Sequence, residues 1–145
     1  MIRDNLSEIE KAQIAVAVDG EGNIGIYRNR QMRKKTGKIR WYYAPTIRIT
    51  NTKKIWLEYF KNMCGGGVLA GEYCVQLTFR HQDALKLAIQ IYPYLIIKKE
   101  KAMSIIKWYE YKKSIERYKM PPDLAEKWLK DNGLWIEPTD KELYI

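Results

Sequence analysis

The sequence predicts a single α+β domain in which two β-hairpins alternate with helices, in the order α-β-β-α-β-β-α-α. Apolar residues repeat with helical spacing up to residue 19, and from residue 23 the period changes to two. The same change of period recurs after the glycine run at residues 65–67. With 145 residues, of which 46% are hydrophobic and 30% charged, the chain is long enough to bury one core.

The first helix is predicted from about Glu8 to Asp19. Ser7 and Glu10 have the spacing of a capping box, and Gly20 and Gly22 end the helical pattern. The apolar helical positions between them are Ile9, Ala12, Ile14, Ala17 and Val18. This helix is therefore expected to pack one side on the core.

A long hairpin is predicted next. Ile24 and Ile26 alternate with polar residues, the stretch 34–38 forms the turn, and the return strand runs from about Ile39 to Thr50. Strand alternation then places two sets of side chains, with Ile47 and Ile49 toward the core and Thr46, Arg48 and Thr50 outward.

The second helix is predicted from about Thr52 to Met63, and its expected inner stripe is Ile55, Tyr59, Phe60 and Met63. A second hairpin then joins residues 68–70 to 73–80 through Gly71. On its longer strand four side chains are expected to face the core, namely Tyr73, Val75, Leu77 and Phe79. Their neighbours Cys74, Gln76, Thr78 and Arg80 are expected to face outward.

Two further helices are predicted, at 82–92 and 98–119, before Pro121 and Pro122 break the chain. A short helix follows over about 123–131. We therefore expect one domain over residues 1–119 and, over 120–145, an acidic appendage with helical and extended parts that packs on the same domain.

The remaining bulk features exclude several classes of protein. Cys64 and Cys74 with the single histidine, His81, are too few for a zinc site or a disulfide framework, and two buried thiols or one bridge across a hairpin remain open. Apolar runs fall short of the roughly 20 residues that span a bilayer, and no secretory signal is recognisable. An intracellular protein without a membrane partner, in a prokaryote or an organelle, is expected.

Positive charge is concentrated in one part of the chain. The net charge is +9, divided into +12 over residues 1–119 and −3 over residues 120–145. Between Glu21 and Glu58 there is no acidic residue, whereas ten basic ones occur: Arg28, Arg30, Arg33, Lys34, Lys35, Lys38, Arg40, Arg48, Lys53 and Lys54. A solvated face would account for some basic residues, but an acid-free stretch of this length favours nucleic acid as the partner.

The outward faces of the two hairpins carry side chains that match base edges in a DNA major groove. The candidates are Tyr27, Asn29, Gln31, Arg33, Arg40, Tyr42, Thr46, Arg48, Thr50, Gln76, Thr78 and Arg80. Arg28 and Arg30 fall on the nominal inner face of their strand. These two arginines either reach phosphates beyond the edge of the core or mark a bulge.

Residues 14–24, with the sequence IAVAVDGEGNI, resemble the motif that names the LAGLIDADG family. Two further segments resemble the family: residues 50–52 (TNT), where it has a polar active-site residue, and residues 92–99 (YPYLIIKK), with Lys98 at the place of its basic residue. The resemblance covers roughly residues 8–115. It implies an αββαββα fold with a saddle-shaped antiparallel sheet, extended here by extra C-terminal helices.

The resemblance also implies a function, that of a site-specific homing endonuclease, typically intron-encoded, which hydrolyses double-stranded DNA with Mg²⁺. Glu21 and the Gly20 carbonyl would hold the ion, and Mn²⁺ or Ca²⁺ could occupy the same place; no small-molecule cofactor is expected. Lys98 would stabilise charge on the scissile phosphate or tune the attacking water, and Asn51 would position that water. Asp19 would close the helix end and support Glu21.

One motif in one chain implies a homodimer that cuts both strands of a long, near-palindromic site. The expected interface is on the first helix, at Gln13, Val16, Ala17 and Gly20, with Ala15 beside them. Val16 stands where the family usually has glycine, which implies a wider or shifted helix crossing. Asn51 is likewise shorter than the glutamine often found at its position.

Two other functions fit the same residues, an RNA maturase of this fold and a DNA-binding regulator without catalysis. Both would leave Glu21 and Lys98 without a role. A magnesium-dependent nicking assay on DNA separates the three hypotheses.

Overall fold

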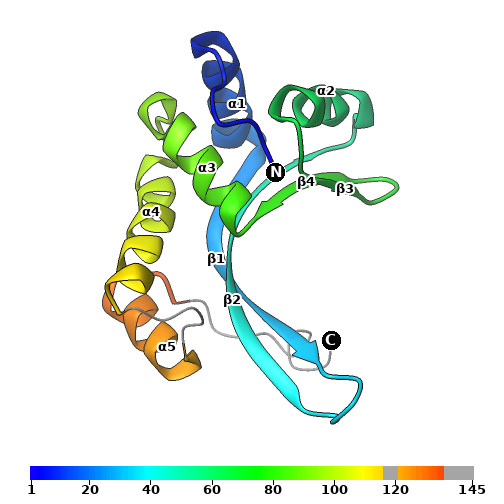
Figure 1. Ribbon diagram of the computed structural model, residues 1–145. Helices are drawn as coiled ribbons and strands as arrows, with labels where there is room; N and C mark the ends of the chain where they lie inside the picture. The colour runs from blue at the N-terminus through cyan, green and yellow to red at the C-terminus, as the bar shows by residue number, and fades with distance from the viewer. Residues whose placement is uncertain (116–120, 136–145) are drawn as a thin grey trace.

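The computed structural model of the chain describes residues 1–115 and 121–135, and it confirms the predicted α+β fold class (Figure 1). The elements in order are α1 (Glu8–Glu21), β1 (Gly22–Met32), β2 (Ile39–Asn51), α2 (Lys54–Cys64), β3 (Val68–Ala70), β4 (Val75–Arg80), α3 (Gln82–Ile91), the 3-10 turn η1 (Tyr92–Tyr94), α4 (Lys99–Ser114) and α5 (Pro122–Asp131). Residues 116–119, predicted to end the fourth helix, lie outside the described residues.

The strands form one antiparallel sheet in the order β1-β2-β4-β3. Figure 1 shows β1 and β2 as a long, curved hairpin, with α1, α3 and α4 along one side of it. Pairing between β1 and β2 runs without interruption from Gly22 opposite Ile49 to Met32 opposite Ile39. This unbroken register excludes a bulge in β1 as the explanation for Arg28 and Arg30.

The core lies between one face of this sheet and the helices. Strand alternation is as predicted for Ile24, Ile26, Ile47 and Ile49, all of which are buried. Val75, Leu77 and Phe79 of β4 are buried on the same side. The helices supply Ile14 and Val18 of α1, Leu57 of α2, Leu87 and Ile91 of α3 and Ile105 of α4.

Three core predictions in α2 and before β4 were wrong. Ile55 is 78% exposed and Tyr59 52% exposed, because α2 begins at Lys54 and turns a different stripe inward: Leu57, Phe60 and Cys64. Tyr73 is 90% exposed because it precedes the first residue of β4. Of the two cysteines, Cys64 is buried and Cys74 exposed, and both are free thiols.

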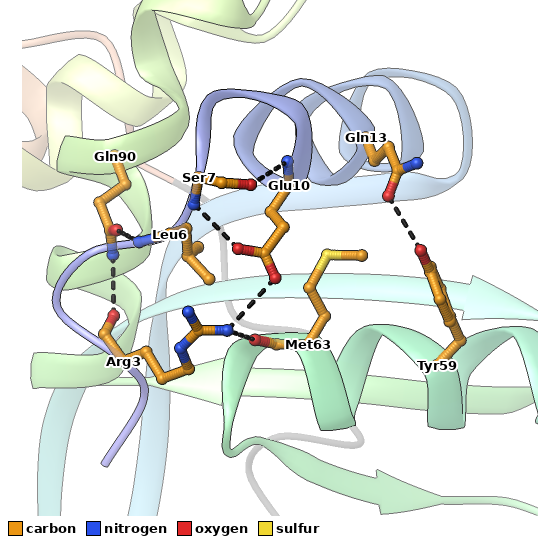
Figure 2. A network of polar contacts seen from close by, with 8 residues as sticks. All are labelled: Arg3, Leu6, Ser7, Glu10, Gln13, Tyr59, Met63 and Gln90. Carbon is orange, nitrogen blue, oxygen red and sulfur yellow. Dashed lines mark hydrogen bonds and ion pairs between the residues drawn. The ribbon is translucent and has the colours of Figure 1, made fainter.

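The N-terminal residues tie three helices together, as Figure 2 shows. The Leu6 amide donates to Gln90 Oε1 of α3 at 2.8 Å, and Gln90 Nε2 donates back to the Arg3 carbonyl at 3.0 Å. The Arg3 guanidinium donates to Glu10 of α1 and to the Met63 carbonyl of α2, both at 3.2 Å. The start of α1 is therefore held against α2 and α3, and the predicted capping box is present.

The described part of the predicted appendage packs on the hairpin and on α4. Ala125 and Leu129 of α5 are buried, and the Trp128 ring meets Trp108 of α4 edge-on at 5.4 Å. Tyr43 of β2 contacts both Trp108 and Trp135.

Gly22 is required where α1 turns into β1. A Cβ at this position would lie 2.6 Å from the Val18 carbonyl oxygen and 3.0 Å from that of Arg48. We expect Gly22→Ala to lower the free energy of unfolding by about 1–3 kcal/mol, because backbone atoms must shift to admit the methyl group. Denaturant titration measures this change, and the exposed neighbour Asn23→Ala should stay within about 0.5 kcal/mol of the parent. Equal effects of the two substitutions would contradict the packing described.

Candidate functional site

The junction between α1 and β1 carries the predicted carboxylate. Glu21 is the last residue of α1 and is exposed, and β1 begins at Gly22. Since Gly22 pairs with Ile49 of β2, the junction lies against the central strand of the sheet. The Glu21 side chain is thus displayed where the helix meets the sheet.

Asp19, two residues earlier, fastens the start of α4 to the end of α1. Its carboxylate accepts hydrogen bonds from the amides of Ile96 at 2.7 Å, Lys98 at 3.0 Å and Ile97 at 3.2 Å. Although desolvation by itself raises the pKa of Asp19, these amides and the charge of Lys98 hold that pKa below its ordinary value. An ionised carboxylate at the N-terminus of α4 also meets the positive end of the helix dipole.

Lys98 reaches the same junction with its side chain. Its ammonium Nζ donates to the Asp19 carbonyl oxygen at 2.6 Å, while its backbone amide donates to the Asp19 carboxylate. The sequence places these residues 79 positions apart, yet the structure brings them into direct contact. Lys98 is therefore held next to the last turn of α1, which also contains Gly20 and Glu21.

Asn51 ends β2, two residues beyond the pair of Ile49 with Gly22. Its side-chain oxygen accepts from the Lys53 amide at 2.8 Å, in a turn that leads into α2. With the oxygen engaged in this turn, Asn51 would act on a water through its Nδ2 amide. Its role in positioning water stays a prediction.

The described residues of one chain bring together too few side-chain ligands for a metal site. Within residues 1–115 and 121–135, no group of three or more His, Cys, Asp or Glu residues is placed to hold an ion. Glu21 and the carbonyls at the end of α1 are oxygen donors of the kind that hard divalent cations take.

The open face of the sheet brings together most of the predicted DNA-binding side chains. Direct cross-strand pairs put Asn29 opposite Tyr42, Gln31 opposite Arg40 and Thr50 opposite Gln76. Arg33 lies beyond the end of β1 and is exposed, as is Arg80 at the end of β4. The face therefore presents amide, hydroxyl and guanidinium groups in rows.

Two predicted contacts on this face were wrong, because their side chains are covered. Thr46 is 1% exposed, and its hydroxyl donates to the Ala44 carbonyl at 3.0 Å. Thr78 is 6% exposed, and its oxygen accepts from Arg48 Nε at 3.4 Å. Tyr27 is half-buried, because its ring lies across Gly25, the residue opposite Thr46. Burial raises the pKa of Tyr27, and the charge of Arg48 opposes the shift.

Arg28 lies on the inner face of β1, as strand alternation predicted, and a contact of its guanidinium with a phosphate beyond the edge of the core stays a prediction. Its guanidinium carbon is 3.8 Å from the centre of the Trp41 ring, a cation–π contact. Arg28 stands opposite Tyr43, whose ring packs against Trp108 of α4. Strand alternation places Arg30 on the same side, opposite Trp41, so neither arginine points from the open face.

The outer side of α1 is exposed at three of the predicted interface positions. Gln13, Gly20 and Val16 are exposed, Val16 by 71%, with Ile9 on the same side. A Cβ added at Gly20 would meet no atom within 4 Å, so packing within this chain does not require glycine there. Ala17 was assigned to the interface wrongly: it is 4% exposed and faces the core of its own chain, as does Ala15.

Two residues of α2 extend this exposed surface and were missed from the sequence. Tyr59 donates its hydroxyl hydrogen to Gln13 Oε1 at 3.1 Å (Figure 2), and Ile55 lies one turn earlier on α2. Both were assigned to the core because they are apolar and four residues apart. The burial of Leu57 between them fixes the phase of the helix and turns them outward.

Protonation of Asp19 should lower the free energy of unfolding as the pH falls. Because the folded-state pKa lies below the ordinary value of 3.8, the stabilisation is complete above that value and is lost as pH falls through the folded-state pKa. We expect Asp19→Asn to melt at a lower temperature near pH 7, with the gap to the parent closing below about pH 4. Thermal melts across pH measure this, with the exposed Glu110→Gln as control. A gap that stays constant with pH would contradict the role of the ionised carboxylate.

Every helix among the described residues is too short or too polar to cross a lipid bilayer.

No described protein family matches the sequence, and no curated protein matches it. Solved structures do match. The LAGLIDADG homing endonuclease I-GzeII, solved in complex with its DNA target, superposes with a TM-score of 0.63 at 16% identity, over 96% of this chain and 48% of that one. The LAGLIDADG meganuclease I-AabMI, bound to uncleaved DNA, gives 0.61 at 16% identity, over 92% and 47%.

The homing endonuclease I-CvuI, in complex with a DNA target in the presence of Mg, gives a TM-score of 0.59 at 14% identity, over 69% of this chain and 65% of that chain. The chain therefore spans less than two thirds of I-CvuI and less than half of I-GzeII and I-AabMI. At these identities the likeness concerns the fold. The chain has the fold of the LAGLIDADG homing endonucleases.

Proposed function

We propose that this chain is a site-specific endonuclease that cuts both strands of a long, near-palindromic DNA duplex as a homodimer, with Mg²⁺. The observation that carries the proposal is the position of Glu21. It stands exposed at the end of α1, between the acid-free basic sheet and the exposed side of the same helix. A carboxylate so placed can meet a phosphodiester on the sheet and a second copy of itself across the helix.

The oxygen donors at the end of α1 suit a magnesium ion. Glu21 would supply a carboxylate oxygen and Gly20 a carbonyl oxygen, and the negative end of the helix dipole adds to the attraction. Mn²⁺ or Ca²⁺ takes the same kinds of donor. When bound, such an ion supplies an activated water and neutralises charge on the phosphate.

The chain's own residues would orient the reaction. Asp19 fixes Lys98 through the amides at the start of α4, so the ammonium is held beside the last turn of α1. From there Lys98 would balance negative charge that builds on the scissile phosphate. Asn51, on the adjoining end of β2, would direct the attacking water through its amide.

A homodimer follows from the incompleteness of one chain. A second copy placed across the exposed side of α1 would bring a second Glu21 to the first. The match to 48% of I-GzeII is what half of a two-unit protein would give. In this arrangement Gly20 admits the partner helix closely, and Val16 sets the crossing distance.

Double-stranded DNA would lie on the open face of the sheet. No acidic residue lies between Glu21 and Glu58, so β1, β2 and their turn carry charge of one sign. Base contacts are proposed for the residues that the structure leaves accessible on this face: Tyr27, Asn29, Gln31, Arg33, Arg40, Tyr42, Arg48, Thr50, Gln76 and Arg80. Each copy would read one half of the site.

Removal of the Glu21 charge tests the catalytic part of the proposal. Glu21→Gln should reduce magnesium-dependent cleavage of target DNA by more than about a hundredfold, because a metal ligand is lost, while binding to the duplex persists. Cleavage is followed on gels and binding by electrophoretic shift, with Glu110→Gln as the matched surface control. Tight binding by the parent without any cleavage would instead indicate a DNA-binding regulator. Preference for intron RNA over duplex would indicate a maturase.

A charge on the outer side of α1 tests the dimer. Val16→Lys should leave the fold of each chain intact, since the side chain is 71% exposed, but should raise the dimer dissociation constant by at least about a hundredfold. The matched control is Ile89→Lys on α3, which changes an exposed isoleucine outside the proposed interface. Sedimentation velocity without DNA gives both values. A dimer of unchanged affinity in Val16→Lys would place the interface elsewhere.

A further inference from the structure

A cavity of about 940 Å³ opens beside the outer half of β2, away from the α1–β1 junction. β4 pairs with β2 only between Thr46 and Asn51, so residues 39–44 of β2 extend past the end of β4. The described residues that line the cavity come from both strands and the turn of the hairpin, from His81 and Gln82 at the start of α3, from Trp108 and Lys112 of α4, and from Pro121 and Pro122 at the start of α5. Neither His81 nor Lys112 has a part in the function proposed above.

The charged side chains that line this cavity in the described part of the chain all have the same sign. Arg33, Lys38, Arg40 and Lys112 line it, and no carboxylate is among the described lining residues. Four cations from two separate parts of the chain converge on one hollow. Such a field attracts a chain of phosphates.

The cavity also contains stacked aromatic rings. The imidazole of His81 lies over the Tyr42 ring, with centroids 6.1 Å apart and planes inclined by 25°. Trp41 and Trp108 contribute further apolar ring surface to the lining. Rings beside cations are the elements with which proteins bind unpaired nucleotides, whose bases stack on side chains while phosphates meet the charges.

The backbone holds His81 in a conformation that favours glycine. Its φ is 56° and its ψ is −124°, the one positive φ at a non-glycine residue in the described part of the chain. The His81 amide donates to the Pro45 carbonyl at 2.9 Å, and its carbonyl accepts from the Leu85 amide at 3.0 Å. Partial burial, with Lys112 and Arg80 nearby, lowers the pKa of His81. Strain retained at an accessible ring indicates a function for that ring.

We propose that this cavity binds a single-stranded nucleic acid, with a base stacked against the Tyr42–His81 pair and neighbouring phosphates on Lys112, Lys38 and Arg40. A duplex does not fit these features as well, because its base faces are already stacked inside the helix and its phosphates need no recess. The site is distinct from the Glu21 junction. It adds a second nucleic-acid ligand to a protein whose open face is proposed to hold duplex DNA.

Substitutions at His81 and Lys112 distinguish single-strand binding from duplex binding. Arg33, Arg40 and Tyr42 also belong to the proposed duplex face, so their loss would affect both. His81 and Lys112 line the cavity and are not among the side chains proposed to contact the duplex. His81→Gly removes the ring and suits the backbone conformation, His81→Asn is a second variant that tolerates positive φ, and Lys112→Gln removes one charge. Lys107→Gln, also on α4 but exposed and outside the cavity lining, is the matched control.

The test is fluorescence anisotropy with labelled oligouridylate and oligothymidylate, without divalent cations, over a series of salt concentrations. Both His81 variants should bind each strand about tenfold more weakly than the parent, because one stacking surface is lost. Lys112→Gln should weaken binding and reduce the slope of log affinity against log salt by about 0.7, the value for one phosphate contact on a single strand. Lys107→Gln should match the parent, and the His81 and Lys112 variants should lose much less affinity for the target duplex than for the single strands.

Three results would overturn the proposal: no binding of either strand by the parent, equal affinities for the parent and all His81 and Lys112 variants, or an equal loss for target duplex and single strand. The last would mean that the cavity holds the flank of the duplex. Binding of single strands is measured without metal and without cleavage. This test therefore remains informative even if the endonuclease proposal fails. Melting temperatures of the variants confirm that each one is folded.

Discussion

The contact between Asp19 and the start of α4 is the constraint on which the candidate site depends. A single carboxylate accepts three consecutive amides, and the lysine that follows returns its ammonium to the carbonyl of the same aspartate. These bonds join the end of α1 to a segment 79 residues later in the chain. They hold the last turn of α1, which displays Glu21, against the start of α4 and place the ammonium of Lys98 beside it. The contacts that Asp19 makes in this chain are therefore structural, and they lie beside the two residues proposed to act on the phosphate.

The fold could be predicted from local sequence patterns. Most errors in that prediction arose where a pattern of apolar residues could face the core in either of two ways. Alternation in the strands placed Ile47 and Ile49 correctly, because a period of two leaves only two choices and the polar neighbours decide between them. Helix α2 contains apolar residues on both sides, so its sequence did not distinguish Leu57 from Ile55 as the buried residue. Sequence also placed Thr46 on the open face, which is correct by alternation, but alternation does not show that Thr46 is 1% exposed or that the Tyr27 ring lies across Gly25, the residue opposite Thr46.

The two glycines at the end of α1 show how far the single chain explains its own sequence. Gly22 is required within the chain, because a methyl group there would meet the backbone of Val18. Gly20 has open space around it, so packing within this chain does not require glycine there, whereas the proposed partner helix would. The same reasoning applies to the exposed Val16 and to the acid-free sheet, since neither feature stabilises the single chain. In the proposed complex, Val16 would contact a second copy and the sheet would contact a polyanion. Contacts within the chain thus explain residues such as Gly22, whereas Gly20, Val16 and the acid-free sheet are explained by the proposed partners.

The central claim is that two copies of Glu21 meet at one metal site on bound DNA. The most direct measurement is the anomalous scattering of Mn²⁺ in crystals of the protein with its target duplex. The account predicts two chains on each duplex and manganese density between the Glu21 carboxylates and the scissile phosphates. Manganese bound away from Glu21, or one chain alone on each duplex, would contradict it.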